Sequence, residues 1–166
     1  MANHRTSFSG DLLRGAIAGA VATWAMDQVT TSLLEQASDS DKAQEKAVQP
    51  RGRSSARNLT DMLVDQLGID ASEDQRSQAA TAVHWCLGIV PGALYGALRR
   101  RVPLLGAGRG LVYGTVLFLG NDEYLNSELG FAADPGAYPA STHVRGFVGH
   151  LVLGAATDTV CDLLGG

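Results

Sequence analysis

Charged residues are scarce in this chain. Of its 166 residues, 18% are Asp, Glu, Lys or Arg and 45% are hydrophobic, a low charge content for the surface of a soluble domain. The net charge is −4 and no basic stripe is interleaved with aromatic residues, which argues against nucleic acid as a partner. The two cysteines, Cys86 and Cys161, lie inside apolar helical patterns. We interpret them as small buried hydrophobes rather than as a disulfide or a nucleophile.

The signature motifs of several enzyme classes are also absent. The sequence has no Gly-Lys phosphate-binding loop, no Cys-x-x-Cys pair and no strand–turn–helix context for a nucleophilic serine. Its Arg-Gly pairs lie in predicted helices rather than after strands, so a dinucleotide site is not expected. Function must therefore be inferred from where the polar residues are placed.

The chain consists mainly of apolar, glycine-rich helical sequence. Four long helices are predicted, at about 11–36, 73–100, 108–129 and 142–164. The first two are joined by a polar linker over 36–72, which holds one short amphipathic helix around Leu59–Leu67. We predict an all-α fold: residues 1–166 form a single helical-bundle domain, a four-helix up-down bundle with one extra short helix in the first connection.

Glycines recur at four-residue spacing along the predicted helices. Such small residues let two helix backbones approach closely, as is common between membrane helices. The glycines expected to mediate packing are Gly15, Gly19, Gly88, Gly92, Gly96, Gly110, Gly114, Gly149 and Gly154. A Gly-to-Asp separation of twelve residues also occurs three times, for Gly15–Asp27, Gly110–Asp122 and Gly146–Asp158. In a chain with 20 glycines this repeated spacing does not establish an internal sequence duplication.

The choice between membrane and water rests on opposing features. The uninterrupted apolar runs are shorter than the roughly 20 residues of a spanning helix, which favours a soluble bundle. The helices are nevertheless apolar on all faces for several turns, and their interfaces are rich in Gly and Ala. The 99–109 turn carries four arginines, whereas 121–142 carries acids and no Lys or Arg, which is the positive-inside pattern.

We therefore predict a membrane protein with both termini cytoplasmic and the lipid bilayer as its partner. The small-residue faces of its helices also favour self-association, and a dimer is expected.

Ionisable residues converge at one end of the predicted bundle. In an up-down bundle, late residues of the first and third helices share a level with early residues of the second and fourth. This places six residues at the outer end: Asp27, His84, Asp122, Glu123, His143 and His150. The set is suited to a divalent transition metal such as zinc, iron or manganese.

Each of these residues also has a structural interpretation, such as capping a helix or pairing with an arginine. Three functional hypotheses therefore stay open. The first is a metal-binding membrane protein with the six residues as ligands. The second is a proton or ion pathway that uses the same groups as relays. The third is a soluble or peripheral helical subunit whose polar cluster only fixes packing. Whether the protein is an enzyme is not decided by the sequence.

Several segments resemble one known family. The runs GAIAGAVATWAMDQV, AVHWCLGIVPGALYG, LGNDE and YPASTHVRGFVGHLVLG are similar, in the same order, to the YagU-like family of uncharacterised bacterial inner-membrane proteins. The resemblance covers the four long helices and not the 36–78 segment. It implies a small multi-pass inner-membrane protein, and the polar motif positions of the family fall on the six residues named above. It implies no activity.

Overall fold

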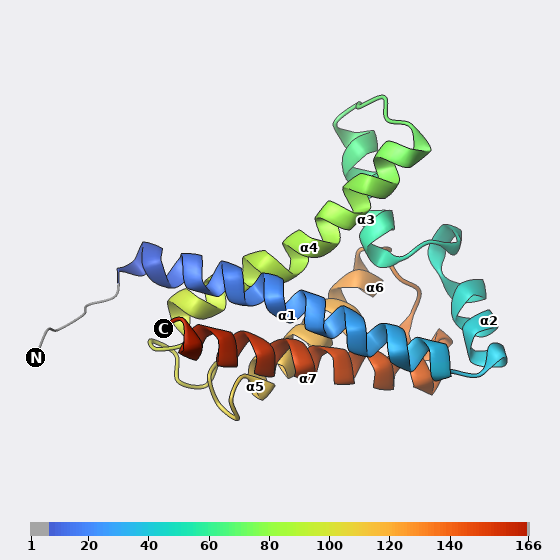
Figure 1. Cartoon of the computed structure of the whole chain (residues 1–166). Coiled ribbons are helices and arrows are strands. Elements are labelled where there is room, and N and C mark those ends of the chain that lie inside the picture. Colours follow the sequence, from blue (N-terminus) through green and yellow to red (C-terminus); the bar gives the residue numbers. More distant parts are fainter. Residues whose placement is uncertain (1–6, 166) are drawn as a thin grey trace, which may run out of the picture.

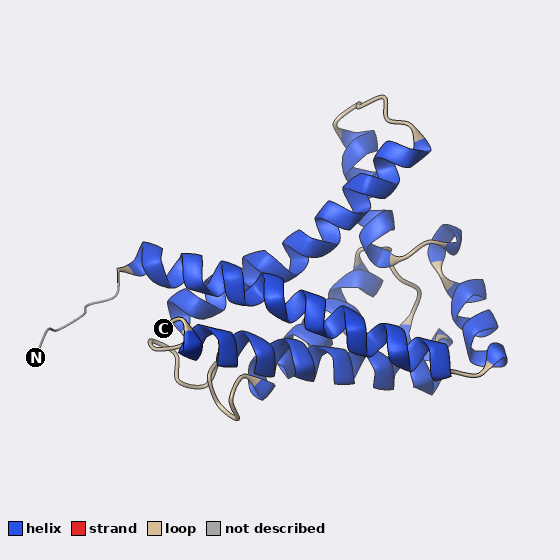
Figure 2. Ribbon diagram, in the orientation of Figure 1, coloured by secondary structure: helices blue, strands red, loops and turns tan. Residues whose placement is uncertain are grey.

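The computed structural model describes residues 7–165, and every regular element among them is helical (Figures 1 and 2). This confirms the all-α prediction. The elements are α1 (Phe8–Gln36), α2 (Asp39–Val48), η1 (Pro50–Gly52), α3 (Ser55–Gln66), α4 (Glu73–Leu98), α5 (Leu111–Leu117), η2 (Phe118–Leu125), α6 (Asn126–Glu128), η3 (Pro135–Ala137) and α7 (Ala140–Leu163). The long helices α1, α4 and α7 pack together, with α1 against both of the others. The predicted third helix is realised as α5, the π-helical η2 and α6 in succession.

Side-chain caps set the beginnings of the helices. Ser7 accepts a hydrogen bond from the Gly10 amide at the start of α1. The predicted capping box at the start of α4 is confirmed, because Ser72 and Gln75 bond each other's backbone amides. Such reciprocal caps satisfy amides that the first helical turn leaves without partners.

The connection between α1 and α4 contains more structure than predicted. Residues expected to form a polar linker with one short helix form two helices, α2 and α3. The α2 helix buries no residue, so hydrophobic periodicity gave no sign of it. Local signals account for it instead. Ser38 caps its first turn, Asp39 and Asp41 lie at its positive end, and Lys46 lies in its last turn.

Glycines hold the helices of the bundle in backbone contact. A Cβ atom on Gly19 of α1 would lie 2.6 Å from the Gly88 carbonyl oxygen of α4, and one on Gly96 would lie 2.5 Å from the Asp11 carbonyl oxygen. Gly110, directly before α5, and Gly114 of α5 face the backbone of α7 at Gly154 and His150 in the same way. The predicted packing role of the glycines is confirmed, since no side chain fits at these contacts.

These contacts also show how the helices run. Gly15 meets Gly92 and Gly19 meets Gly88, so α1 and α4 are antiparallel. Gly110 meets Gly154, and Gly114 meets His150 one turn earlier, so the segment from α5 through η2 opposes α7. Two antiparallel pairs, α1–α4 and α5–α7, are thus built on the same Gly-x-x-x-Gly contact. In each pair an aspartate follows the first glycine by twelve residues, at Asp27 and at Asp122.

The two pairs join differently on their two sides. Between α1 and α7 the contact is broad, with the fully buried Ala18 and Ala22 on α1 and Gly149 on α7. Between α4 and α5 the buried rings of Tyr95 and Tyr113 are the spacers, with centroids 4.6 Å apart. Because tyrosines are much bulkier than alanines, α4 and α5 stay further apart, and beyond the tyrosines the space between α4 and η2 is open.

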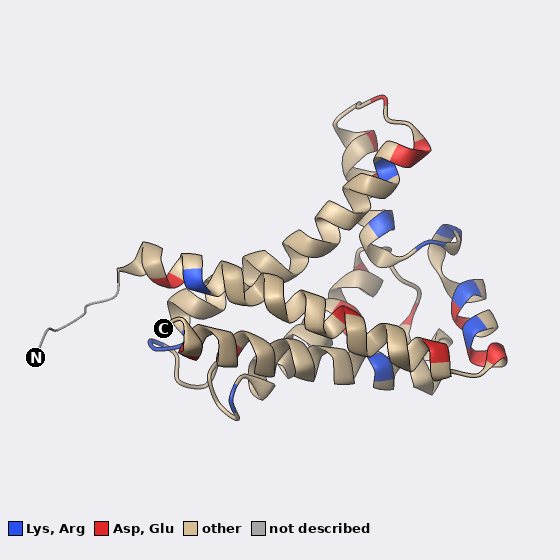
Figure 3. Ribbon diagram, in the orientation of Figure 1, with Lys and Arg blue, Asp and Glu red and all other residues tan. Residues whose placement is uncertain are grey.

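Both described ends of the chain lie together with the 99–109 turn, at what we call the arginine end (Figures 1 and 3). Arg14 of α1 donates to the Leu164 carbonyl oxygen at 2.9 Å. Arg99 binds Asp158 at 2.9 Å and Asp162 at 2.7 Å, and the Tyr95 hydroxyl donates to Asp158 at 2.5 Å. The opposite end, which carries α2, α3 and the 129–139 segment, is called the cavity end.

Large apolar side chains cover the outside of the bundle between the two ends. We call this band the apolar girdle; it consists of Leu13, Ile17, Val21, Trp24, Leu87, Val90, Leu94, Leu111, Val116, Leu119, Val144 and Phe147. Within the described residues, α4 is the one helix long and apolar enough to cross a membrane. The core helix of a soluble protein passes the same test but is mostly buried, whereas 28% of the apolar window of α4 is buried.

The two cysteines have different environments. Cys161 is buried in the core as predicted, whereas Cys86 on α4 is exposed. The interpretation of Cys86 as a buried hydrophobe was therefore wrong. A helix that is apolar on every side gives no indication of which face is covered.

The glycine contacts lead to a stability prediction. Gly19→Ala should lower the free energy of unfolding by about 1–3 kcal/mol, the typical cost of overpacking, because the added methyl group meets the α4 backbone. The matched control is Gly120→Ala, since a Cβ at Gly120 meets nothing within 4 Å. Thermal unfolding followed by circular dichroism measures both. Equal melting temperatures for the two variants would contradict the packing role of Gly19.

Candidate functional site

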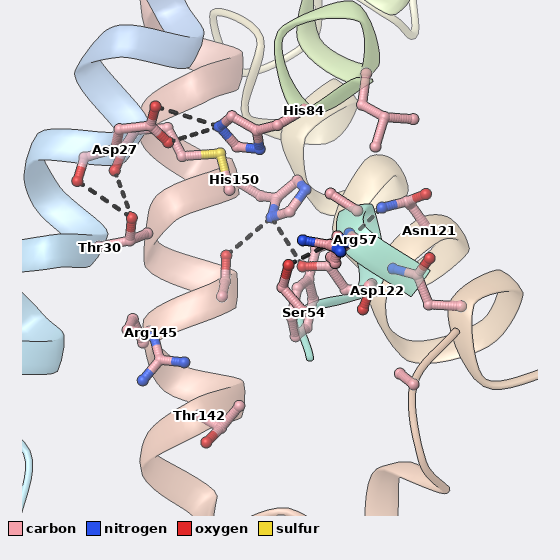
Figure 4. A pocket seen from close by; sticks show the side chains of 18 of the residues that line it. Asp27, Thr30, Ser54, Arg57, His84, Asn121, Asp122, Thr142, Arg145 and His150 are labelled. Atoms are coloured by element: carbon pink, nitrogen blue, oxygen red, sulfur yellow. Dashed lines mark hydrogen bonds and ion pairs between the residues drawn. The ribbon is translucent and has the colours of Figure 1, made fainter. Parts of the chain in front are cut away.

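A cavity of about 770 Å³ opens at the cavity end, between α1, α4, η2 and α7 and beneath the segment from α2 to α3. Figure 4 shows part of its lining. All six residues singled out in the sequence line this one cavity: Asp27, His84, Asp122, Glu123, His143 and His150. Their predicted convergence from different helices is therefore correct. Their arrangement, however, is three separate carboxylate–imidazole pairs.

The first pair joins α1 to α4. The His84 Nε2 atom lies 2.9 and 3.2 Å from the two carboxylate oxygens of Asp27, with both side chains partly exposed to the cavity. Since a carboxylate only accepts, Nε2 carries the proton of this hydrogen bond. No described residue bonds the other ring nitrogen, Nδ1. A carboxylate thus orients an imidazole whose second nitrogen is available to a ligand or to solvent.

The second pair joins η2 to α7. His150 is 6% exposed, and its Nδ1 donates to the Gly146 carbonyl oxygen at 2.9 Å, with an Asp122 oxygen at 3.6 Å from the same atom. Asp122 also accepts from the Asn121 side-chain amide at 2.8 Å. The His150 Nε2 atom has no hydrogen-bond partner among the described residues. This nitrogen is therefore an acceptor that a donor entering the cavity can reach.

The third pair is the most fully bonded. The His143 Nδ1 atom lies 2.7 Å from Glu123 and its Nε2 lies 3.0 Å from the Pro135 carbonyl oxygen. A carbonyl oxygen only accepts, so Nε2 donates to Pro135. The pair therefore leaves neither nitrogen of the His143 ring open to the cavity. It ties the start of α7 to η2 and to the 129–139 segment.

The predicted metal ligand set is not assembled. Among residues 7–165, no group of three or more His, Cys, Asp or Glu side chains is placed to hold a metal ion. The physical reason is that Asp27 and Glu123 accept hydrogen bonds from histidines, and Asp122 accepts one from Asn121 while it lies beside His150. Sequence spacing placed the residues at one level of the bundle but did not show these pairings.

The segment predicted as a linker also contributes to the cavity wall. Four charged residues line this wall: Glu45 of α2, Arg53 before α3, Arg57 on α3 and Arg145 of α7. Arg145 donates to Glu45 at 2.6 Å, and the Thr142 hydroxyl donates to the same carboxylate at 2.8 Å. An arginine in the apolar α7 sequence was the one signal for this contact. The docking of α2 could not be inferred, because α2 has no apolar face.

A buried carboxylate holds α3 against α4 and so closes the cavity from above. Asp61 is 1% exposed and accepts from Arg53 at 2.6 Å, Arg57 at 3.0 Å and Arg76 at 3.4 Å. Burial alone would raise the pKa of this carboxyl group. The hydrogen bonds and charges of the three arginines outweigh burial and hold the pKa of Asp61 below its ordinary value.

We call the segment from α2 to α3, which covers the cavity, the cap. A second buried polar side chain fixes the loops around this cap. The Asn58 side-chain amide lies 3.0 to 3.2 Å from the carbonyl oxygens of Pro50, Arg53 and Phe131, to which it donates. It thereby connects η1 and α3 to the 129–139 segment on the far wall of the cavity. The cap is thus positioned by polar contacts at α2, at Asn58 and at Asp61.

Comparison of the chain with protein-family models, with curated proteins and with solved structures gives no match. The resemblance to the YagU-like family therefore stays an expectation, and the site is interpreted from its own geometry.

The lowered pKa of Asp61 makes the stability of the cap depend on pH. The folded form binds a proton less readily than the unfolded chain. The contribution of Asp61 is therefore complete above its ordinary pKa of about 3.9, and it is lost as the pH falls from there through the lowered pKa of the folded form. Near pH 7, Asp61→Asn should cost about 2 kcal/mol, the scale of a hydrogen bond to a charged group. Its stability should also fall less on acidification than that of the wild type.

Asp65→Asn is the matched control for this experiment. Asp65 also binds Arg76, but its side chain is 62% exposed, so its loss should cost less than about 1 kcal/mol. Urea unfolding at several pH values measures all three proteins. Parallel pH profiles for the wild type and Asp61→Asn would show that Asp61 does not supply the acid-sensitive stability.

Proposed function

We propose that the protein is a small membrane protein, inserted through the bundle of α1, α4, the α5–η2 segment and α7. The apolar girdle supports this, because it leaves bulky side chains exposed on all four helices. Charged residues concentrate on α2, α3, the start of α4 and the arginine end, and residues 77–98 of α4 carry none (Figure 3). With the arginine end in the cytoplasm, both termini are cytoplasmic and the cavity faces the outer side of an inner membrane.

Membrane insertion has a direct test. The protein should stay in the membrane fraction after alkaline washing. In a Cys86→Ala background, Ser55→Cys in the cap and Leu104→Cys in the 99–109 turn should react with a membrane-impermeant maleimide from opposite sides of the membrane. Labelling of both from the same side would contradict the orientation. Recovery without detergent as an oligomer that buries the girdle would instead identify a soluble helical subunit.

We further propose that the cavity exchanges protons as it binds its ligand. The observation that carries this is the lining of one cavity by three carboxylate–imidazole pairs. Histidine is the side chain that changes charge near neutral pH, and a carboxylate beside it favours the protonated ring. The accessible nitrogens of His84 and His150 are where protons would enter and leave.

The proposal is confined to exchange at the cavity end. Between His150 and the Asp158–Arg99 ion pair, α7 passes through the packed core at Leu153 and Thr157. The Thr157 hydroxyl is occupied by a hydrogen bond to the Leu153 carbonyl oxygen. A continuous relay across the bundle therefore has less support than a cavity open to one face.

Histidine 15N NMR tests proton exchange at these groups. At about pH 8, where neutral imidazole dominates, His84 should carry its proton on Nε2 and His150 on Nδ1, because those nitrogens donate to Asp27 and to Gly146. On acidification the second nitrogen of each ring should take up a proton. Asp27→Asn should change the signals of His84 and leave those of His150 in place, and Asp122→Asn should do the reverse. If His84 and His150 showed the same tautomer, or if neither ring took up a proton on acidification, proton exchange at these groups would be excluded.

Metal binding is a second candidate, favoured by one observation. In metal sites the non-coordinating nitrogen of a histidine typically donates to a carboxylate or a backbone carbonyl. His84 and His150 both have this arrangement, and their remaining nitrogens line the same cavity. Adding equimolar Zn²⁺ to the NMR sample should then shift Nδ1 of His84 and Nε2 of His150 together, and His150→Gln should abolish the shift at His84. Unchanged spectra would rule this candidate out.

A further inference from the structure

The cavity presents hydrogen-bond acceptors that its own arginines do not satisfy. Its open acceptors include Nε2 of His150, which lies in a ring 6% exposed, and Nδ1 of His84. The carboxylates of Asp27 and Asp122 add oxygens partly open to the cavity, with side-chain exposures of 34% and 33%. Each carboxylate oxygen can accept more than one hydrogen bond. These four groups come from α1, α4, η2 and α7, so they surround the opening from separate walls (Figure 4).

The arginines of the lining are already engaged by other protein groups. Arg57 binds Asp61 at 3.0 Å and Glu73 at 2.7 Å, and Arg53 binds the same two carboxylates. Arg145 is held by Glu45 at 2.6 Å. Several hydroxyl groups of the lining also donate within the protein; these are Thr23, Thr30, Thr81 and Thr142. An anionic ligand meets arginines whose charge is already balanced by carboxylates, whereas a ligand that donates finds acceptors ready.

The charge of the lining leads to the same conclusion. Asp27, Asp122 and Glu123 each lie beside an imidazole, and no ion pair joins any of them to an arginine of the described residues. When these rings are neutral, the cavity has more negative than positive charge at the histidine level. A cation is therefore favoured over a neutral ligand or an anion of the same shape.

The size and the apolar side of the cavity define the rest of the ligand. A volume of about 770 Å³ is in the range of small-molecule sites and far exceeds that of a bare ion. Trp85, Phe118, Leu153 and Met26 line it together with the polar groups. Aromatic rings bind the apolar body of a ligand and also attract its positive charge.

From these observations we infer that the ligand is a small organic cation, an ammonium group on an apolar body. The inference rests on the proposed proton-exchanging cavity and specifies what that cavity binds. The ammonium group lies among the carboxylates of Asp27 and Asp122 and the open nitrogens of His84 and His150. It donates its three N–H groups to those within reach, while its apolar body packs beside Trp85 and Phe118. Protons and the cation are attracted by the same groups, so they compete for the cavity.

The charged and titratable groups that face the cavity determine this competition. They come from every element around it: Asp27 on α1, Glu45 on α2, Arg53 before α3, Arg57 on α3, His84 on α4, Asp122 and Glu123 on η2, Tyr138 after η3, and His143, Arg145 and His150 on α7. Imidazoles that take up protons on acidification add positive charge beside the carboxylates. Cation binding should therefore weaken as the pH falls.

The test uses the full chain in detergent with three probes of matched shape: benzylammonium, phenylacetate and benzyl alcohol. A Trp24→Phe background leaves Trp85, in the cavity wall, as the single tryptophan. Benzylammonium should change the Trp85 fluorescence saturably at about pH 8 and should bind more weakly at about pH 5.5. Phenylacetate and benzyl alcohol should bind more weakly than benzylammonium at both pH values. Asp27→Asn and Asp122→Asn should each weaken binding by about tenfold, through loss of a charge-assisted hydrogen bond.

Asp70→Asn is the control, because Asp70 is exposed and lies outside the lining. Circular dichroism confirms that each variant is folded, and the two cavity variants serve as independent checks. Equal binding of phenylacetate, or benzylammonium binding that neither cavity variant weakens, would overturn the cation assignment. If the histidines exchange protons as proposed but benzylammonium does not bind, only the ligand assignment fails. If benzylammonium binds equally at both pH values, the cation assignment stands and proton exchange fails.

Discussion

Direct backbone contact between helices is the constraint on which the rest of this structure depends. Where Gly15 and Gly19 meet Gly92 and Gly88, no side chain separates α1 from α4, and α5 meets α7 in the same way. Such contact forces the bulky side chains of these helices to point outward, which produces the apolar girdle. Toward the cavity end the close contact stops, at the level of the aspartates that follow the glycines. There the helices are separated by side chains, and a cavity lined by ionisable groups has room to form.

The cavity is asymmetric because the two helix pairs join differently. Small residues close the seam between α1 and α7, whereas Tyr95 and Tyr113 act as spacers between α4 and α5. Above the tyrosines the space is covered by α2 and α3. These two helices are attached mainly through Glu45, Asn58 and Asp61, that is, through hydrogen bonds and ion pairs. A cap attached in this way covers one side of the cavity and holds its arginines in ion pairs.

Much of the fold and of the site location was predictable, for identifiable reasons. Four apolar, glycine-spaced segments can bury their small residues only against one another, so the long helices and their glycine contacts followed from periodicity. An up-down order makes successive long helices antiparallel, which places Asp27 and His84 at one level, and likewise Asp122 and His150. The roles of these residues were not predictable. Whether a carboxylate binds a metal, caps a helix or orients an imidazole depends on distances of an ångström or two, which residue spacing does not encode.

By itself, then, the amino-acid sequence determined the helical class, the glycine interfaces and the level at which the ionisable residues meet. These properties depend on local periodicity and on the size of side chains. The tertiary structure alone decided which carboxylate pairs with which histidine and which ring nitrogens stay open. It also decided that a polar segment with no apolar face folds back as the cap. These features depend on contacts between residues as far apart as Glu45 and Arg145, and such contacts form only when separate helices are packed side by side.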